Sequence, residues 1–391
     1  MPQPSLGKDS VAVTGAVIGL GSVGLGWLTL KPNRLAAGTS LSMWESFSGY
    51  GTIVLGLWLA CLLLSVMGRR KSNIIALGIT ANLAIIIIIV LTGLASSRLV
   101  AGTPLARVSL STGFWASAAG AYMVIFATRR QLSGLPLWQN LTTWPSLVAL
   151  VLLLTTGWFD NLSILRELAG RRERFWQELV NHLGLFGGSV ILGTIIGIPL
   201  GIWAARSKRA EAPLFFLTNI AQTIPSLALF GILIAPLSAL SFAFPALREL
   251  GIRGVGNTPA IIALVIYSLL PIVRNTFVGL RQLDPAVVDA GRGMGMSRFQ
   301  LFRQIELPLA TPLVLEGLRT ASVQAVGNTA VAALIGAGGL GWFIFQGLGE
   351  AAPDLIVLGA IPIIVLALVV DLIMRNIIRL TTPKGLRGST Q

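Results

Sequence analysis

Residues 289–310, DAGRGMGMSRFQLFRQIELPLA, gather charged and aromatic side chains in a chain that is otherwise mostly apolar. Phe299, Phe302 and Ile305 recur at three-residue spacing, which places them on one face of a helix, with Arg303 largely elsewhere. Such a helix presents apolar knobs to a groove on another protein. A helix lying on membrane headgroups is the alternative, and the pattern alone leaves both open.

Two short helices are expected to position these side chains. Asp284 followed by Pro285 is typical of an N-cap and a first helical turn. Gly295 permits a turn after that helix, and Ser297 is a suitable cap for a second one. Pro308 is expected to end the second helix, because proline removes a backbone donor.

The composition is that of a membrane protein. Of the 391 residues, 54% are hydrophobic and 11% are charged, against about 25% charged in ordinary soluble domains. The formal net charge of +14 is compatible with nucleic-acid binding, but the 29 lysines and arginines lie mostly in short loops beside apolar runs. That distribution sets membrane topology, so we expect membrane lipid and no nucleic acid as a partner.

Hydropathy predicts an all-α polytopic membrane protein with about ten transmembrane helices. The predicted spans are residues 11–30, 52–67, 74–94, 109–128, 142–159, 179–205, 213–237, 260–280, 309–335 and 354–374. The predicted organisation is an N-terminal accessory membrane half (1–160), an amphipathic linker on the outer surface (161–178), a C-terminal core of five helices (179–380) and a cytoplasmic tail (381–391).

Basic residues follow the even-numbered spans, which predicts a multi-pass protein of the bacterial inner membrane with both termini in the cytoplasm. These residues are Arg69, Arg70, Lys71, Arg129, Arg130, Arg206, Lys208, Arg209, Arg281, Arg292, Arg298 and Arg303, with Arg375, Arg379, Lys384 and Arg387 in or near the tail.

Few residues indicate catalysis or metal binding, so no catalytic or metal site is expected. Cys61 lies inside an apolar run, and the sole histidine, His182, is interpreted as an interfacial residue. No phosphate-binding G-x-x-x-x-G-K-[ST] loop occurs, which predicts that this chain does not hydrolyse ATP. The G-x-G-x-x-G at residues 336–341 follows a membrane span rather than a strand and is interpreted as a tight outer loop that re-enters between helices.

A transporter driven by ions usually needs a titratable group deep in the membrane. The charged residues near the spans fall close to their predicted ends: Glu178, Arg274, Glu316, Arg319 and Asp371. Proton coupling is therefore poorly supported, although sodium sites built from backbone carbonyls stay possible for an ion-coupled secondary carrier.

The stretch resembles the EAA loop of bacterial ABC-importer permeases, whose pattern is E-A-A, three residues, G, nine residues, I, one residue, L-P. The matching residues here are Asp289, Ala290, Gly291, Gly295, Ile305, Leu307 and Pro308. Asp289 replaces a glutamate and Gly291 an alanine. The resemblance implies that these residues, with Phe299 and Phe302, couple the permease to a cytoplasmic ATPase.

The resemblance extends over residues 173–380. The segments QTIPSLALFGILI, YSLLPIVRNTFVGLRQLDPAVVDAGRGMGMS and VGNTAVAALIGAGGLG are similar to permeases of osmoprotectant importers, and the extra N-terminal half is similar to the long form of that family. It implies a type I permease core, ATPase subunits that bind the ATP, a second permease subunit and a periplasmic or extracellular substrate-binding protein. No cofactor of its own is expected, and another small solute is an alternative substrate.

Polar side chains in the C-terminal spans are candidates for the substrate pathway. They are Asn219, Gln222, Thr223, Ser226, Gln324, Asn328 and Thr329. Hydrogen bonding between neighbouring helices is an equally weighted role for such residues. Pro225 and Pro271 are expected to kink their helices.

Overall fold

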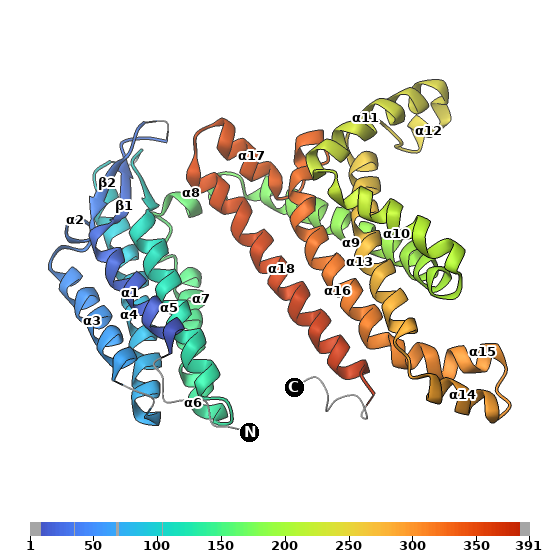
Figure 1. Ribbon diagram of the computed structural model, residues 1–391. Coiled ribbons are helices and arrows are strands. Elements are labelled where there is room, and N and C mark those ends of the chain that lie inside the picture. Colours follow the sequence, from blue (N-terminus) through green and yellow to red (C-terminus); the bar gives the residue numbers. More distant parts are fainter. Residues whose placement is uncertain (1–8, 35, 68–69, 104, 384–391) are drawn as a thin grey trace. The chain divides into compact units, whose positions relative to one another are not determined.

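The computed structural model describes residues 9–383 except 35, 68–69 and 104, and the chain divides into two units, Met1–Gly170 and Arg171–Gln391. Arg69, Lys384 and Arg387, and with them the predicted tail beyond residue 383, lie outside the described residues. The two units are described separately below (Figure 1).

The first unit is mostly helical, with three short strands. Its elements are α1 (Ser10–Gly21), β1 (Gly26–Lys31), β2 (Thr39–Ser42), α2 (Met43–Phe47), α3 (Gly51–Val66), α4 (Lys71–Val100), β3 (Arg107–Leu110), α5 (Thr112–Gln131), α6 (Pro136–Leu141), α7 (Pro145–Thr155) and α8 (Ser163–Gly170).

The predicted first span, 11–30, is wrong in its second half. Helix α1 ends at Gly21, and Gly26–Lys31 is instead the central strand of an antiparallel sheet ordered β2-β1-β3. Glycines interrupt the helical run there, and Trp27 fixes the turn by donating from its indole Nε1 to the carbonyl of Ser22 at 2.9 Å. The apolar run at residues 11–30 therefore contains a helix and a strand rather than one helix.

Close helix approach builds the core of the first unit. Gly15 of α1 and Gly120 of α5 leave no room for a Cβ, since each would lie 2.6–2.7 Å from the other's carbonyl oxygen. The fully buried Trp58 of α3 donates its indole N–H to Ser117 of α5 at 3.0 Å. Small residues let the backbones meet, and the buried polar groups are paired.

The second unit contains the elements that position the candidate site. They are α9 (Arg172–Arg206), α10 (Lys208–Thr223), α11 (Ser226–Ala243), α12 (Pro245–Glu249), α13 (Asn257–Arg281), α14 (Pro285–Gly293), α15 (Arg298–Leu301), a π-helical turn (Phe302–Glu306), α16 (Leu307–Val331) with a 3₁₀ turn (Ala332–Ile335), α17 (Gly341–Gly349) and α18 (Pro353–Thr381).

Six helices in the described part of the chain are long and apolar enough to cross a membrane. They are Met43–Val66, Lys71–Val100, Arg172–Arg206, Ser226–Ala243, Asn257–Arg281 and Pro353–Thr381. The predicted spans 11–30 and 142–159 correspond to the shorter apolar helices Ser10–Gly24 and Pro145–Thr155. The multi-pass α-helical fold is confirmed, while the count of ten spans stays a prediction.

Helices α9, α13 and α16 form the centre of the second unit. Gly193, Gly197 and Gly201 recur every four residues on α9, and a Cβ on any of them would collide with a side chain of α13. Gly317 of α16 packs against the carbonyl of Pro271, and α13 runs unbroken through this proline. This small-residue stripe allows the close packing that holds membrane helices together.

The predicted span 213–237 is two helices rather than one kinked helix. Ile224 and Pro225 are extended, which separates α10 from α11. Proline lacks an N–H and disfavours helical backbone in the residue before it. Tyr267 of α13 hydrogen-bonds to the backbone and side chain at this break. Its hydroxyl donates to the Ile224 carbonyl at 2.5 Å, and its own carbonyl accepts from the side chain of Gln222 at 2.7 Å.

The predicted linker, 161–178, is divided between two elements. Residues of α8 belong to the first unit, whereas α9 begins at Arg172 and continues as a single helix to Arg206. Glu178 is therefore part of a long helix and is 1% exposed, not an acid on an outer surface helix.

Candidate functional site

The segment between α13 and α16 forms two short helices joined by a turn (Figure 1). Asp284 caps α14 by accepting a hydrogen bond from the N–H of Ala286 at 2.9 Å, with Pro285 in the first turn. Ser297 and Gln300 form a reciprocal capping box at the start of α15. Both caps expected from the sequence are confirmed.

Two glycines of this segment have different reasons to be glycine. Gly295 has φ +79° and open space around it, so the backbone of the turn requires it. Gly291 is buried, and a Cβ there would lie 2.7 Å from a methyl of Leu301 and 2.8 Å from one of Ile305. The glycine in place of alanine at residue 291 thus lets α14 pack closely on the helix that follows.

The prediction that Pro308 ends the second helix is wrong. The backbone continues from α15 through the π-helical turn into α16, and the N–H of Leu307 donates to the carbonyl of Phe302, five residues earlier. A wider turn relieves the clash between the proline ring and the preceding turn. The segment is consequently continuous with a core helix.

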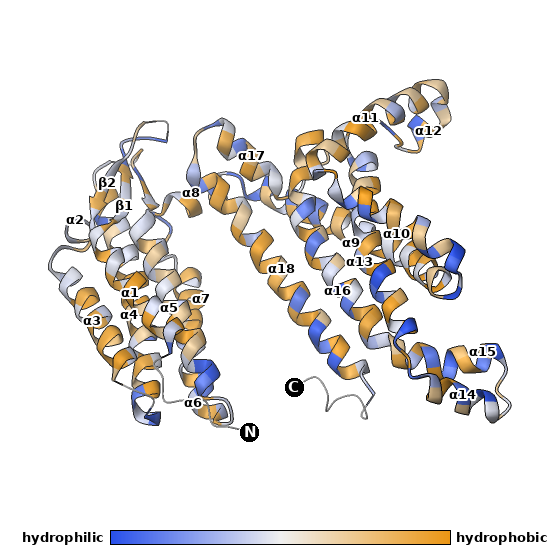
Figure 2. Cartoon of the chain, in the orientation of Figure 1, coloured by the Kyte–Doolittle hydropathy of each residue, from blue (hydrophilic) through white to orange (hydrophobic). Residues whose placement is uncertain are grey.

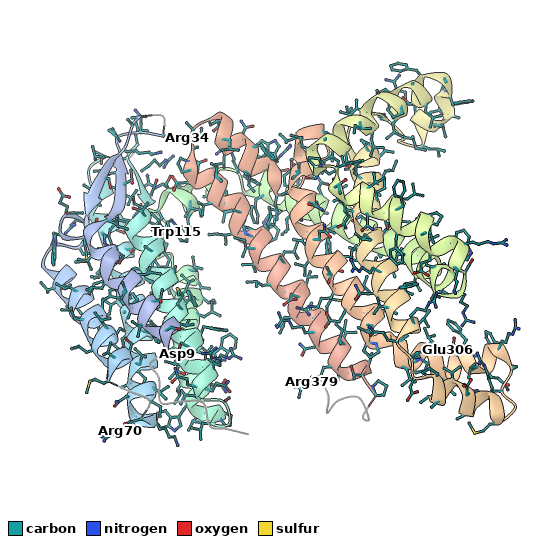
Figure 3. All side chains as sticks on the ribbon, viewed as in Figure 1. Asp9, Arg34, Arg70, Trp115, Glu306 and Arg379 are labelled. Carbon is teal, nitrogen blue, oxygen red and sulfur yellow. The ribbon has the colours of Figure 1, made fainter. Side chains whose placement is uncertain are left out.

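Arg206, the last residue of α9, contacts this continuous helix. Its guanidinium pairs with Glu306 and lies 5.1 Å from the ring centroid of Phe302. Glu306 is labelled in Figure 3 where the segment meets α16. A salt bridge and a cation–π contact from one side chain connect the segment to a second core helix.

The predicted coupling residues fall into an exposed and a packed set. Phe299 is 68% exposed, and Met294 beside the turn is 70% exposed. Phe302 and Ile305 are half-buried against Arg206 and Gly291. Asp289, Ala290, Leu307 and Pro308 are exposed, with Asp289 paired to Arg292 at 3.0 Å. Phe299 is therefore the aromatic side chain of this segment that is exposed to solvent.

The predicted pathway residues do not all present polar groups to open space. Thr329 is fully buried and donates to the carbonyl of Ala325 at 2.7 Å, while Gln222 is used at the break before Pro225. Thr223 donates to Ile220 at 2.8 Å. Asn219 is exposed, and Ser226, Gln324 and Asn328 are partly exposed. Their role in a pathway stays a prediction.

The G-x-G-x-x-G segment binds α9 at the end of the unit opposite to α14 and α15 (Figure 1). Gly336, Gly338 and Gly339 all have positive φ. The Glu178 carboxylate accepts from the N–H of Gly339, and the fully buried His182 accepts from Leu340. The interpretation of His182 as interfacial is wrong, because it lies inside the helix packing.

A group of charged residues on α16 and α18 was interpreted from the sequence only as residues near span ends. Arg319 donates to Asp371 at 2.6 Å and to Glu316 at 3.0 Å, and Arg375 pairs with Asp371 at 2.7 Å. An i, i+3 or i, i+4 pair of opposite charges on each helix is the sequence signal for such a cluster.

Long apolar helices indicate a multi-pass membrane protein, and a capped helical hairpin projects from them between α13 and α16. The family model described as the binding-protein-dependent transport system inner membrane component matches residues 197–382. That described as the N-terminal domain of the ABC transporter permease YehY matches residues 8–165. The expected long form with an additional N-terminal half is confirmed.

Three relatives are each similar to about half of this chain. A glycine betaine/carnitine/choline transport system permease of Bacillus subtilis is 39% identical over 207 residues, covering 53% of this chain and 88% of the relative. A carnitine transport permease of Listeria monocytogenes is 42% identical over 216 residues (55% and 90%). An osmoprotectant import permease of Salmonella typhimurium is 40% identical over 206 residues (53% and 91%).

This chain belongs to the family of permease subunits of osmoprotectant ABC importers. Membership of the family implies that the chain works with a separate ATPase and a substrate-binding partner. It also implies that the helices described above cross the inner membrane several times.

Proposed function

We propose that this chain conducts an osmoprotectant such as glycine betaine across the inner membrane, and that residues 284–308 dock on a cytoplasmic ATPase subunit. The observation that carries the proposal is the hairpin itself, which is doubly capped, bears the exposed Phe299 and Met294 at its tip and continues without interruption into α16. An exposed aromatic side chain on a well-capped helical hairpin is suited to a groove on a partner protein.

Motion of the ATPase reaches the core along two routes. One is the helical continuity from α15 through the π-helical turn into α16, since a helix transmits displacement along its axis. The other is Arg206, which joins the same turn to α9 through Glu306 and Phe302. Because α9, α13 and α16 pack closely, a push on the hairpin moves the core as a unit and alternates access to the pathway.

The proposal includes an orientation. Asp9, at the start of α1, pairs with Arg130 at 3.2 Å, so the described N-terminal end of the first unit lies beside the basic end of α5. Within the second unit, α18 ends on the side of α14 and α15 (Figure 1). Basic residues mark the cytoplasmic side, so both termini are cytoplasmic on this proposal.

The proposed assembly has two permease subunits, of which the second is a copy of this chain or a relative. Two ATPase subunits bind and hydrolyse ATP, so that this chain needs no ATPase site or cofactor of its own, and a binding protein delivers substrate from outside. The substrate class is supported by relatives that carry glycine betaine, carnitine and choline by their descriptions. Another small solute is the alternative substrate.

The docking proposal is tested with two matched glycine substitutions. Gly295→Val forces a β-branched residue into positive φ, whereas Gly293→Val lies in open space at a helical φ two residues away. We expect Gly295→Val alone to lose ATPase copurification and ATP-dependent uptake in vesicles, with both variants inserted normally. Full uptake by Gly295→Val, or uptake that follows an ion gradient without ATP, contradicts the proposal.

A further inference from the structure

The charged cluster of Glu316, Arg319, Asp371 and Arg375 joins α16 to α18 in the second unit. Arg319 is twelve residues into α16, about 18 Å along the helix at about 1.5 Å per residue. Asp371 lies in a helix apolar enough to span the membrane, and Figure 2 shows hydrophilic bands in the C-terminal part of this helix, α18. A charged side chain on a membrane-crossing helix faces protein or water rather than lipid, because its desolvation is costly.

The cluster borders an open groove of about 400 Å³ lined by Arg319, Thr320, Val323, Gln324 and Asp371. Four of these five residues are polar, but most of the surface that lines the groove is apolar, so the groove places a charged pair beside an apolar wall. The side chains of Arg319 and Asp371 are 25% and 20% exposed. The ion pair is therefore reachable from the groove, not sealed inside the helix packing.

Arg319 has donors left over. Its Nε is engaged by Asp371 and its Nη1 by Glu316, while Nη2 has no partner among the residues that the structure describes. A guanidinium carries five N–H donors in a fixed fork, which matches the two oxygens of a carboxylate. The N–H donors of Nη2 are thus available to an oxygen of an anionic group.

We propose that this groove is a transit site for zwitterionic solutes, with Arg319 binding the carboxylate and Asp371 facing the cationic end. Gln324 offers an amide to the same solute from the next turn of α16. This inference rests on the proposed function and adds that α16 of this chain itself binds the carboxylate of the solute. Two charges of opposite sign in one groove match a betaine, whereas choline has no carboxylate for Arg319 to bind.

Attraction between Arg319 and the two acids, Glu316 and Asp371, keeps the affinity of the groove for the solute low, as transit requires. A carboxylate arriving at Nη2 competes for the charge of a guanidinium that already has two partners. The quaternary ammonium donates no hydrogen bond, so only the field of Asp371 holds it. Binding that is favourable enough to enter and weak enough to leave is a condition for passage.

The test uses the complete importer reconstituted in vesicles with its ATPase and binding protein, and measures uptake of glycine betaine and of choline. Arg319→Gln removes the fork. The double variant Glu316→Gln/Arg319→Gln also removes one acid, so the net charge of the cluster is unchanged and folding is protected. Arg375→Gln is the matched control, because it also loses an ion pair to Asp371 but does not line the groove.

We expect both Arg319 variants to lose about tenfold or more of glycine betaine uptake, with assembly intact by size-exclusion chromatography and choline uptake much less affected. Arg375→Gln should leave the ratio of the two solutes unchanged. Equal loss of both solutes, recovery of betaine uptake in the double variant, or a wild-type importer that carries choline alone overturns the inference. Uptake of neither solute by the wild type instead overturns the proposed function, and this inference with it.

Discussion

The carboxylate of Glu178 accepts a hydrogen bond from the backbone N–H of Gly339, at 2.5 Å between Oε2 and N. His182, one turn further along α9, accepts from the N–H of Leu340 and contacts the carbonyl of Val326 through its other ring nitrogen at 3.2 Å. A Cβ on Gly338 would lie 2.6 Å from the Glu178 carboxylate. The glycine-rich loop and the sole histidine therefore serve one purpose, the attachment of α9 to the segment between α16 and α17.

Removal of the Glu178 carboxylate is expected to destabilise this attachment. Glu178→Ala leaves the buried N–H of Gly339 without an acceptor, which costs about 1–3 kcal/mol. Thermal unfolding in detergent should show the loss. Glu173→Ala, an exposed acid on the same helix, is the control and should unfold like the wild type. Equal stability of the two variants contradicts the proposed importance of this hydrogen bond.

The sequence predicted where the glycine-rich loop lies but not what it binds. Glycines at 336, 338 and 339 indicated a tight backbone, and their positive φ values agree. His182 and Glu178 looked peripheral because they stand near the polar start of an apolar run. Their partners are backbone groups 161 and 158 residues further along the chain, and a side chain that pairs with backbone leaves no complementary residue to find in the sequence.

Gly291 provides a test of packing in the hairpin. Gly291→Ala restores the residue more usual in the resembling motif, yet its methyl would meet Leu301 and Ile305. Both contacts are with ends of flexible side chains that can turn aside, so we expect a modest loss of about 1 kcal/mol, at the lower end of overpacking costs. ATPase copurification should weaken slightly. Gly293→Ala, in open space, is the control, and tighter copurification by Gly291→Ala would contradict the packing argument.

Tyr267 stabilises the break between α10 and α11 that Pro225 produces. Tyr267→Phe keeps the ring but removes the hydroxyl that donates to the Ile224 carbonyl, at a cost of about 1–3 kcal/mol for the orphaned acceptor. Thermal unfolding should detect this, whereas Tyr50→Phe, which removes the hydroxyl from an exposed ring, should have no effect. Loss of uptake without loss of stability would instead assign Tyr267 to the pathway.

Hydropathy located the membrane-crossing regions better than it located their ends. The span predicted at 260–280 corresponds to Asn257–Arg281, whereas 213–237 joined two helices and 11–30 joined a helix to a strand. In both failures an apolar run continues through a change of backbone, at Pro225 or at the glycines after α1. The sequence drew attention to Arg319 and Asp371 but not to their pairing, since the two residues lie on different helices and are 52 residues apart.

Arg206 offers the sharpest test of how the hairpin moves the core. Arg206→Glu replaces attraction to Glu306 with repulsion and removes the cation–π contact with Phe302. The hairpin caps and Phe299 are untouched, so the ATPase should still copurify while uptake per ATP hydrolysed falls up to about fivefold, as expected for a partly exposed charge pair worth up to about 1 kcal/mol. Arg209→Glu, three residues on, is the control for a basic residue at the same end of the core.

Restoring the ion pair between residues 206 and 306 distinguishes a loss of coupling to the ATPase from a loss of folding. The charge-swapped variant Arg206→Glu/Glu306→Arg re-forms the ion pair, and we expect it to recover part of the lost uptake per ATP, since a new guanidinium again meets a carboxylate. Recovery is incomplete because the cation–π contact with Phe302 depends on the position of the arginine. If the double variant assembles normally but does not regain uptake per ATP hydrolysed, the ion pair of Arg206 does not transmit motion to α9. The ATPase would then act on the core through α16 alone.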